Sequence, residues 1–375
     1  MWYNRIYEKK DTYLKKGKVN LLYGPRRVGK TALIKHLLKN INKKIFIGDG
    51  DDIQLRKILS SNDKNVILSA LQDYDYIFID EAQRIPDIGW GLKILVDNLP
   101  KTILIASGSS SFQLSSQVGA PLTGRSITNM LFPISITELR KQFGGMHIIQ
   151  NLNNYLIYGM YPEVLNAGNN NDKISYLFEL RNSYLLKDIL ELENIRNSDK
   201  LFDLLRLLAF QIGNEVSLSE LGNNLEIAKQ TVSRYLDLLE KAFIIKKIGG
   251  FSRNLRKEVT KTNRYYFLDI GIRNAIINNF NLLEFRNDIG MLWENFIVME
   301  RLKTQHYNKI FSNNYFWRTY DQKEVDLVEE REGKLFGYEF KWSPKKHKIQ
   351  KEWLNTYNNA SFEVINRDNF LQFLI

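Results

Sequence analysis

Short apolar runs alternate with helix-like patterns along the first 140 residues. Four runs bounded by polar residues have the length of buried strands, at 21–23, 44–48, 76–79 and 102–106. Apolar residues at helical spacing follow the first run. Strands that are apolar throughout are typical of a parallel sheet covered on both faces. The pattern therefore predicts an α/β domain at residues 1–140.

The pattern turns helical after about Ile134. Apolar residues then recur three and four positions apart, for instance at Leu177, Leu180, Tyr184 and Leu185. We interpret residues 141–197 as a helical lid and spacer.

Residues 198–280 show one helix, then two shorter helices and two strand-like runs. Ser217 and Glu220 form a capping-box signature that begins the first short helix, and Asn223 and Asn224 predict the turn after it. The second short helix has a buried stripe made of Val232, Tyr235, Leu236 and Leu239. With strands at 243–248 and 264–268, this arrangement predicts a winged helix-turn-helix domain.

Residues 281–375 begin with an amphipathic helix at 291–304, in which Glu294 interrupts the apolar surface. Two strand-like runs follow, EVDLVEE and GKLFGYEFKWS, and they predict a hairpin that turns at 330–334. The segment therefore reads as a small α/β domain.

Composition narrows the chemistry open to the chain. Its 375 residues predict two to four domains. A formal net charge of +11 favours a polyanionic partner, although lysine-rich surfaces also serve solubility. The absence of cysteine excludes disulfides, thiolate zinc sites and cysteine catalysis, so a metal here is expected to be a hard ion such as magnesium.

The start of the chain, MWYNRIYEKK, lacks the apolar core of a signal peptide. No apolar run approaches the roughly 18 residues of a membrane span. We expect a cytoplasmic protein with no membrane partner.

The segment LLYGPRRVGKTALI contains the G-x-x-x-x-G-K-[ST] phosphate-binding loop. A triphosphate needs several backbone N–H groups turned inward, and glycine permits the conformations that this requires. Lys30 supplies a charge for the β and γ phosphates, and Thr31 supplies a hydroxyl for magnesium. The predicted site for ATP comprises Gly24, Pro25, Arg26, Arg27, Val28, Gly29, Lys30, Thr31 and Ala32.

The run at 76–79 ends in Asp80 and Glu81, where a strand meets the nucleotide crevice of an α/β sheet. Asp80 is positioned to hold magnesium, directly or through water. Glu81 is suited to polarise the attacking water as a general base. The pair predicts an ATPase that carries a catalytic glutamate.

Two further polar positions are candidates for catalysis. Ser107 or Ser109, after the run at 102–106, is placed to sense the γ-phosphate, or else belongs to a serine-rich loop that caps a helix. Arg125 in PLTGRS is either an arginine finger or a surface arginine.

Acidic residues and a lysine in the C-terminal segment suggest phosphodiester cleavage. Glu339 and Lys341 share one face of a strand, and Asp326 lies on the neighbouring strand. Asp326 and Glu339 would bind magnesium, Lys341 would favour the attacking hydroxide, and Glu294 would complete the site from the helix. The alternative is a solvated strand face with alternating charges.

The second helix of the helix-turn-helix predicts a nucleic-acid contact. Its exposed face carries Lys229, Gln230, Ser233 and Arg234, which suit phosphates and base edges. The wing adds Lys246, Lys247, Arg253, Arg256 and Lys257. A purely architectural module that packs between domains is the alternative.

Taken together, the motifs resemble those of prokaryotic AAA-type ATPases in which a winged helix and a PD-(D/E)XK nuclease-like domain follow the P-loop domain. The resemblance rests on GPRRVGKT, IFIDEAQRIP, SGSSS, LTGR and YGMYPEV, and it extends from about Arg5 to the C-terminus. It implies nucleotide and magnesium binding by Lys30, Thr31, Asp80 and Glu81. It also implies a finger-like position for Arg125 and a lid role for 158–164. Val325 stands where the nuclease motif has proline, a departure that removes no acid.

The favoured hypothesis is an ATP-hydrolysing, DNA-interacting protein with a magnesium-dependent nuclease domain, able to form a homo-oligomer. The expected fold class is α/β: a P-loop parallel sheet with a helical lid, a winged helix, and a small restriction-endonuclease-like domain. One alternative is an ATP-controlled switch that binds DNA or a protein without cutting. Another is a nucleotide-binding adaptor with an idle Glu81.

Overall fold

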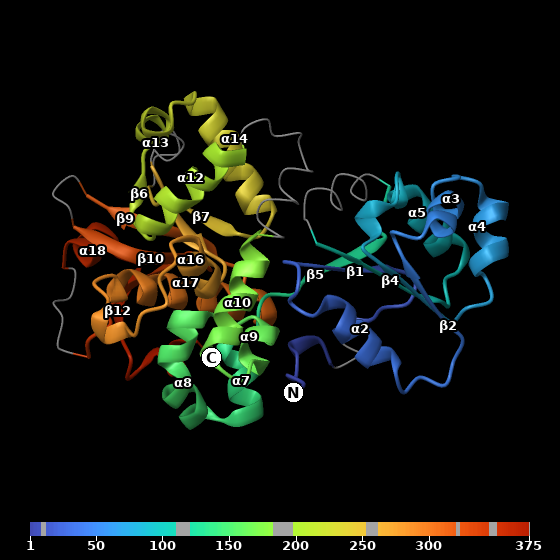
Figure 1. Cartoon of the computed structure of the whole chain (residues 1–375), viewed down its shortest axis with the longest axis horizontal. Helices are drawn as coiled ribbons and strands as arrows, with labels where there is room; N and C mark the ends of the chain where they lie inside the picture. The colour runs from blue at the N-terminus through green and yellow to red at the C-terminus, as the bar shows by residue number, and fades with distance from the viewer. Residues whose placement is uncertain are drawn as a thin grey trace. The chain divides into compact units, whose positions relative to one another are not determined.

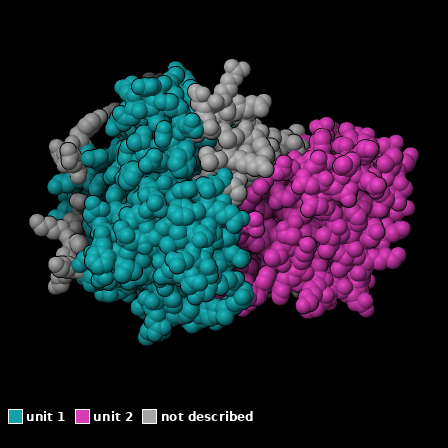
Figure 2. Space-filling model, in the orientation of Figure 1, with its two compact units in different colours: residues 1, 135–240, 244–375 teal, residues 2–134, 241–243 magenta. Residues whose placement is uncertain are grey.

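The computed structural model describes residues 1–8, 13–109, 121–182, 198–252, 262–319, 323–344 and 351–374. These residues form two compact units, coloured separately in Figure 2. The N-terminal unit comprises residues 2–134 and 241–243, and the C-terminal unit comprises residues 1, 135–240 and 244–375. The segments at 141–197, 198–280 and 281–375, which the sequence separates, thus contribute to one compact unit.

Within its described residues, the N-terminal unit is built on a five-stranded parallel sheet of order β2-β3-β4-β1-β5 (Figure 1). The strands are β1 (Val19–Tyr23), β2 (Ile45–Asp49), β3 (Tyr76–Asp80), β4 (Ile103–Gly108) and β5 (Ser126–Met130). The three central strands β3, β4 and β1 are almost fully buried, in keeping with their apolar sequences. The α/β fold predicted for this part of the chain is confirmed.

Helices cover both faces of this sheet. They are α2 (Lys30–Leu38), α3 (Ile53–Leu59), α4 (Lys64–Leu71) and α5 (Ile88–Asn98). The apolar side chains of α3, α4 and α5 share a core with Leu21, Ile77 and Ala106. Helix α2 lies on the other face (Figure 1), where its Leu33 and Ile34 are buried. This layering brings the amino end of α2 to the edge of the sheet where the parallel strands end.

Within its described residues, the C-terminal unit contains a seven-stranded mixed sheet of order β12-β11-β10-β9-β7-β8-β6. The strands are β6 (Glu215–Val216), β7 (Ile245–Gly250), β8 (Asn263–Phe267), β9 (Asn313–Arg318), β10 (Glu324–Arg331), β11 (Lys334–Phe340) and β12 (Ala360–Ile365). Strands β10 and β11 form the expected hairpin, which turns at Glu332 and Gly333 with positive φ angles. Strand β7 pairs in parallel with β9, so the strands of the predicted wing continue into the C-terminal strands.

The helices of this unit surround the sheet. They are α7 (Ile136–Phe143), α8 (Gly145–Tyr158), α9 (Pro162–Asn166), α10 (Asn170–Leu180), α12 (Ser198–Phe210), α13 (Leu218–Leu225), α14 (Lys229–Lys241), α16 (Ile270–Ile276), α17 (Ile289–Asn308), α18 (Lys351–Thr356) and α19 (Phe370–Phe373). Helix α17 contains the predicted helix 291–304 and lies against β8 and β11. No helix in the described ranges has the length and apolar content needed to cross a membrane.

The two short helices that the sequence predicts in this region are present as α13 and α14, with one correction. The Ser217 hydroxyl accepts a hydrogen bond from the Glu220 N–H and caps α13. The turn predicted at Asn223 and Asn224 is wrong, because both residues lie inside α13. The helix continues because Leu225 is buried together with Leu221, and Glu226 makes the turn instead with φ 54°. The predicted stripe of Val232, Tyr235, Leu236 and Leu239 is buried.

Some sequence-based expectations fall outside the described residues. They are Tyr184 and Leu185 of the lid, and Arg253, Arg256 and Lys257 of the wing. In the described part of the lid, Leu177 and Leu180 of α10 are buried.

Candidate functional site

The phosphate-binding loop joins β1 to α2 in a conformation that depends on its glycines. Gly24 has φ 147°, and a Cβ there would lie 2.1 Å from the Leu131 carbonyl oxygen. Gly29, with φ 94°, precedes the first residue of α2. Lys30 is buried, and its Nζ donates hydrogen bonds of 2.9 Å to the carbonyl oxygens of Gly24 and Pro25. The loop therefore wraps around the side chain of its own lysine.

Asp80, at the end of β3, collects hydrogen bonds from two neighbouring elements. Thr31 Oγ1 of α2 donates to Asp80 Oδ2 at 2.6 Å. The Ser107 hydroxyl of β4 and the Glu81 N–H donate to Oδ1. These contacts bring together a hydroxyl and a carboxylate, the oxygen ligands that magnesium uses beside a nucleotide. The residues present therefore fit a magnesium ion held by Thr31 and Asp80.

Glu81 lies just beyond β3 with φ 45° and is held by side chains that follow it. Its Oε2 accepts hydrogen bonds from Gln83 Nε2 and from Ser109 Oγ, the latter at 3.2 Å. Gln83 Nε2 also donates to Ser109 Oγ at 3.1 Å. A short 3-10 turn, η2 (Ala82–Arg84), carries Gln83 back toward the glutamate. The carboxylate predicted to act as general base thus has a fixed orientation.

Sequence reasoning missed Gln83 and gave Arg5 no role. Arg5 is buried, and its guanidinium donates to the carbonyl oxygens of Val28 at 2.7 Å and Phe132 at 2.6 Å. Arg5 therefore stabilises the phosphate-binding loop by linking its Val28 carbonyl to that of Phe132. The signal for Gln83 was its place two residues after Glu81, but Arg5 gave no local signal because its partners are 23 and 127 positions away.

Arg125 lies at the wrong end of the sheet to reach the nucleotide loop of its own subunit. Its carbonyl oxygen accepts a hydrogen bond from Val19 N, at the start of β1, whereas Gly24 follows the end of that strand. Five strand residues at about 3.3 Å each separate the two ends by about 16 Å. The exposed side chain forms an ion pair of 2.7 Å with Asp97 of α5. Within one subunit, a finger role for Arg125 is excluded by this placement.

The acidic residues predicted for the C-terminal site do gather in space. Asp326 on β10 and Glu339 on β11 are buried, and Glu294 projects from α17. Lys341 Nζ lies 2.7 Å from Glu339 Oε1. Burial and the negative charge of Glu339 raise the pKa of Asp326 to about 6. Burial and the charge of Asp326 raise the pKa of Glu294 to about 8.

A guanidinium that sequence reasoning did not anticipate stands among these acids. Arg264 Nη1 lies 3.5 Å from Glu294 Oε1 and 3.5 Å from Asp326 Oδ1, and its Nη2 lies 2.8 Å from Glu324 Oε2. In the described ranges, no three histidine or acidic side chains are arranged so that they could hold a metal ion. The cluster in this arrangement does not fit a magnesium ion.

The predicted nucleic-acid face of α14 borders a hollow. Lys229, Gln230, Ser233 and Arg234 are all exposed, on the side of α14 opposite its buried stripe. Three of them line a cavity of about 470 Å³ together with residues of β7 and β8: Gln230, Ser233, Arg234, Lys247, Asn263 and Tyr265. Asp237 and Glu240 add negative charge, and Glu240 Oε1 is paired with Lys246 Nζ at 2.9 Å.

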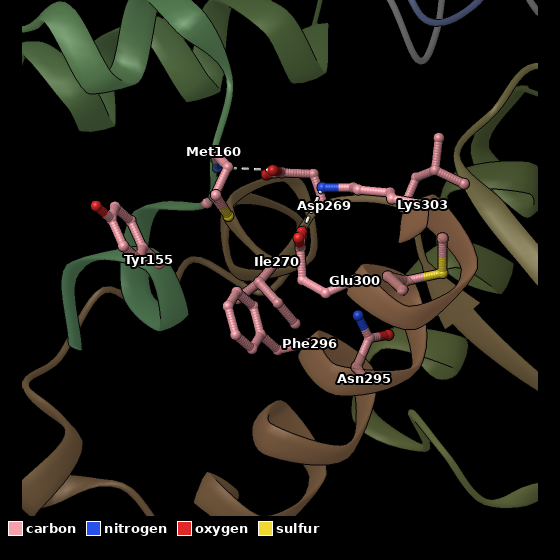
Figure 3. A pocket seen from close by; sticks show the side chains of 11 residues that line it. Tyr155, Met160, Asp269, Ile270, Asn295, Phe296, Glu300 and Lys303 are labelled. Atoms are coloured by element: carbon pink, nitrogen blue, oxygen red, sulfur yellow. Dashed lines mark hydrogen bonds and ion pairs between the residues drawn. The ribbon is translucent and has the colours of Figure 1, made fainter. Parts of the chain in front are cut away.

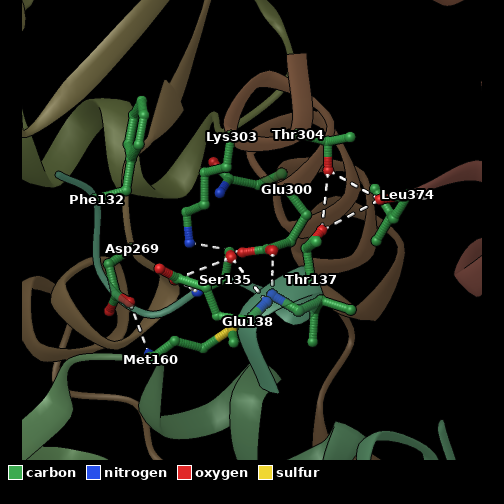
Figure 4. A network of polar contacts seen from close by, with 12 residues as sticks. Phe132, Ser135, Thr137, Glu138, Met160, Asp269, Glu300, Lys303, Thr304 and Leu374 are labelled. Carbon is green, nitrogen blue, oxygen red and sulfur yellow. Dashed lines mark hydrogen bonds and ion pairs between the residues drawn. The ribbon is translucent and has the colours of Figure 1, made fainter. Parts of the chain in front are cut away.

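A buried polar network in the C-terminal unit joins the start of α7 to α17 (Figure 4). Glu300 accepts from the Ile136 N–H at 2.7 Å and pairs with Lys303 Nζ at 2.6 Å. The pocket beside it, shown in Figure 3, is lined by Asp269 and Glu300 among others. Its free volume of about 10 Å³ holds about one water molecule. This network fastens α7 to α17 and leaves no room for a substrate.

The parallel sheet, the loop and the Thr31–Asp80 pair fit a P-loop NTPase-like domain. Residues 16–140 match the family model described as an AAA domain, which supports an AAA-type P-loop ATPase that binds and hydrolyses ATP. Residues 149–283 and 289–368 match two further models, each described as a domain of unknown function.

Several uncharacterized proteins are similar along most of the chain. One from Mycobacterium tuberculosis is 28% identical over 332 residues, which cover 88% of this chain and 71% of the relative. One from Methanocaldococcus jannaschii is 24% identical over 330 residues (83% and 72%), and one from Haemophilus influenzae is 24% identical over 334 residues (83% and 79%). Among solved structures, protein VC1899 from Vibrio cholerae matches with 11% identity, covering 88% of this chain and 96% of its own. The TM-score of 0.18 is too low to carry an argument.

Proposed function

We propose that the N-terminal unit hydrolyses ATP with magnesium held by Thr31 and Asp80 and with Glu81 as the general base. The observation that supports this most directly is the hydrogen bond between Thr31 and Asp80, with Glu81 next in the chain. The AAA-domain match over residues 16–140 supports the same class of activity.

The residues of the site divide the work of binding and hydrolysis. When phosphate enters the loop, Lys30 exchanges its bonds to the carbonyls of Gly24 and Pro25 for the β and γ phosphates. Thr31 and Asp80 would hold magnesium, which would offset the negative charge that develops on the phosphate oxygens. Glu81 accepts a proton from the attacking water as the new P–O bond forms and the bond to the β-phosphate oxygen breaks. Ser107 and Gln83 keep the two carboxylates in place.

Phosphate release from ATP tests this proposal. The wild type is expected to hydrolyse ATP in a magnesium-dependent way, and Lys30→Ala is expected to lose ATP binding. Glu81→Gln is expected to bind ATP but not turn it over. Lys35→Ala, an exposed lysine of the same helix, is the matched control. Unchanged hydrolysis in Glu81→Gln would remove Glu81 from the mechanism.

We further propose that the exposed face of α14 binds duplex DNA, so that the protein acts as an ATP-controlled DNA-binding switch. Support comes from the basic and amide side chains gathered on that face and around the hollow beside it. The net charge of +11 favours the same partner. Nuclease activity is not part of this proposal, because Arg264 stands among the acids that would hold the metal.

Binding to a short labelled duplex at several salt concentrations tests the DNA proposal. The affinity for DNA is expected to fall steeply as the salt concentration rises. The double variant Lys229→Gln/Arg234→Gln is expected to bind DNA more weakly. The slope of log affinity against log salt concentration should also become shallower, by the amount that corresponds to the loss of about two phosphate contacts. Lys334→Gln/Lys351→Gln removes the same charge from exposed positions elsewhere and serves as control. Equal weakening by both double variants would mean that general charge, not α14, accounts for binding.

A further inference from the structure

Arg264 occupies the centre of the acid cluster in the C-terminal unit. It lies on β8, and its side chain is only 5% exposed. Its guanidinium reaches α17 through Glu294 and β10 through Asp326 and Glu324. The ring of Phe316 lies 4.7 Å from the guanidinium carbon and covers one side of it. One buried cation thus links three elements that are far apart in the sequence.

The acids around Arg264 receive further donors from the protein itself. Tyr266, also on β8, donates its hydroxyl to Glu294 Oε1 at 2.8 Å. The Phe340 N–H donates to Asp326 Oδ2 at 2.8 Å, and Lys341 Nζ lies 2.7 Å from Glu339 Oε1. Glu294 Oε1, both oxygens of Asp326 and Glu339 Oε1 are therefore engaged by hydrogen-bond donors and cations. Glu339 Oε2 is buried without a hydrogen-bond partner among the described residues.

A divalent ion and this guanidinium compete for the same oxygens. Magnesium binds carboxylate oxygens at about 2.1 Å and demands near-octahedral geometry. Arg264 Nη1 stands 3.5 Å from both Glu294 Oε1 and Asp326 Oδ1, so its positive charge already faces two of the oxygens that such an ion would need. The arginine would have to leave its carboxylate partners, and a buried cation without partners is costly. Burial alone would lower the pKa of Arg264, but Tyr266 and the neighbouring acids raise the pKa above its ordinary value, so the arginine stays charged.

We propose that Arg264 is the resident cation of this cluster, excludes divalent metal from it, and makes the nuclease-like region a non-cleaving structural junction. The positive charge of Arg264 neutralises the acidic side chains that a metal ion would otherwise neutralise. The cluster then fastens β8 to α17 and β10 instead of cutting phosphodiesters. This inference concerns the C-terminal unit alone and stands apart from the ATPase proposal.

Manganese binding by the nucleotide-free protein tests the exclusion directly. The measurement compares the full chain with Asp326→Asn, both in an Asp80→Asn background that removes the nucleotide-site metal ligand. Titration followed by the electron paramagnetic resonance of Mn²⁺ is expected to give the same weak binding for both. Tighter binding in the protein that retains Asp326 would overturn the proposal. This comparison needs no change at Arg264.

Removing the arginine provides the second test. Arg264→Gln is expected to lower the melting temperature by roughly 10 °C, since it leaves Glu294 and Asp326 buried without the positive charge of Arg264. It is also expected to gain Mn²⁺ binding of at least tenfold higher affinity, and Mn²⁺ should restore part of the lost thermal stability. Both gains should vanish in Arg264→Gln/Asp326→Asn. A folded Arg264→Gln that binds no more Mn²⁺ than the wild type would show that Arg264 is not what excludes the metal.

Cleavage of supercoiled DNA gives an independent result. With magnesium or manganese, and with or without ATP, the wild type and Asp326→Asn are expected to leave the substrate equally intact. Cutting by the wild type that disappears in Asp326→Asn would overturn the proposal.

Discussion

Thr31 Oγ1 donates a hydrogen bond of 2.6 Å to Asp80 Oδ2, although the two residues are 49 positions apart. The contact joins the first turn of α2 to the end of β3 at the edge where the parallel strands end. If Thr31 and Asp80 hold magnesium as proposed, this bond aligns their oxygens before any nucleotide arrives, so ordering them costs little.

Thr31→Val should therefore impair metal use more than nucleotide binding. The valine keeps the shape of the side chain but removes the hydroxyl from both Asp80 and magnesium. The magnesium concentration for half-maximal hydrolysis is expected to rise about tenfold or more. Ser69→Ala removes an exposed hydroxyl of α4 and is expected to leave this value unchanged. An unaltered magnesium requirement in Thr31→Val would argue against Thr31 as a ligand.

Gln83→Ala tests whether the orientation of Glu81 matters for turnover. Loss of the Gln83 donor frees the Glu81 carboxylate, so kcat is expected to fall about tenfold while the affinity for ATP stays the same. Ser109→Ala should have the smaller effect, because its hydroxyl makes the longer bond of 3.2 Å. Steady-state kinetics combined with equilibrium binding of ATP separates the two quantities. A parallel loss of ATP affinity would instead indicate a structural role for Gln83.

Arg125→Ala should leave the hydrolysis rate of an isolated subunit unchanged. The side chain lies at the opposite end of β1 from the phosphate-binding loop and pairs with Asp97 at the surface. An exposed pair of this kind contributes little to stability. Hydrolysis measured across a range of protein concentrations distinguishes an Arg125 that acts in its own subunit from one that acts on a neighbouring subunit. A loss that appears only at high concentration would assign Arg125 to a neighbouring subunit, and a loss at every dilution would contradict its placement.

Asp288 should make the C-terminal unit sensitive to acid. Burial alone would raise its pKa, but hydrogen bonds from Arg286 and Arg273 and their positive charge lower the pKa to about 2. Because this lies below the value of about 3.9 in an unfolded chain, the stabilisation is complete above about pH 4 and is lost as pH falls toward 2. The shift corresponds to about 2 kcal/mol at neutral pH.

Denaturant unfolding at pH 7 and at pH 3 measures this dependence. Asp288→Asn is expected to be destabilised by about 3 kcal/mol at pH 7, since Arg273 and Arg286 stay buried without their counter-charge. Its stability should also change less between the two pH values than that of the wild type. The exposed Asp368→Asn is the control. An equal pH response in wild type and Asp288→Asn would rule out this carboxylate as the source.

The candidate nucleotide site can be recognised from the sequence because its parts lie in short linear segments. The loop around Lys30 and the end of β3 at Asp80 each carry their own sequence signal, and parallel strands bring their ends to one edge. The position of Arg125 was not predictable in this way. Its distance from the loop depends on the direction in which β5 runs beside β1, which the local sequence does not encode.

In the C-terminal region, too, contacts between residues far apart in the sequence could not be predicted from local sequence patterns. Glu339 lies on β11 and Lys341 comes directly after the end of that strand, so alternation along the extended chain places the two side chains together. Arg264 pairs with acids 30 and 60 positions away, and nothing near it in the sequence marks it as their partner. The prediction of a turn at Asn223 and Asn224 was wrong for a different reason. The burial of Leu225 outweighed the preference of asparagine for turns.

The parallel pairing of β7 with β9 has a consequence for how this chain can change over evolutionary time. Gly249 and Gly250 on one side and Tyr315 and Phe316 on the other share main-chain hydrogen bonding within one continuous sheet. A recombination event that exchanged only the stretch after α16 would leave β7 with a bare strand edge, which is prone to aggregate. The segment that carries α14 and the segment that carries the acid cluster are therefore expected to be inherited as a single block.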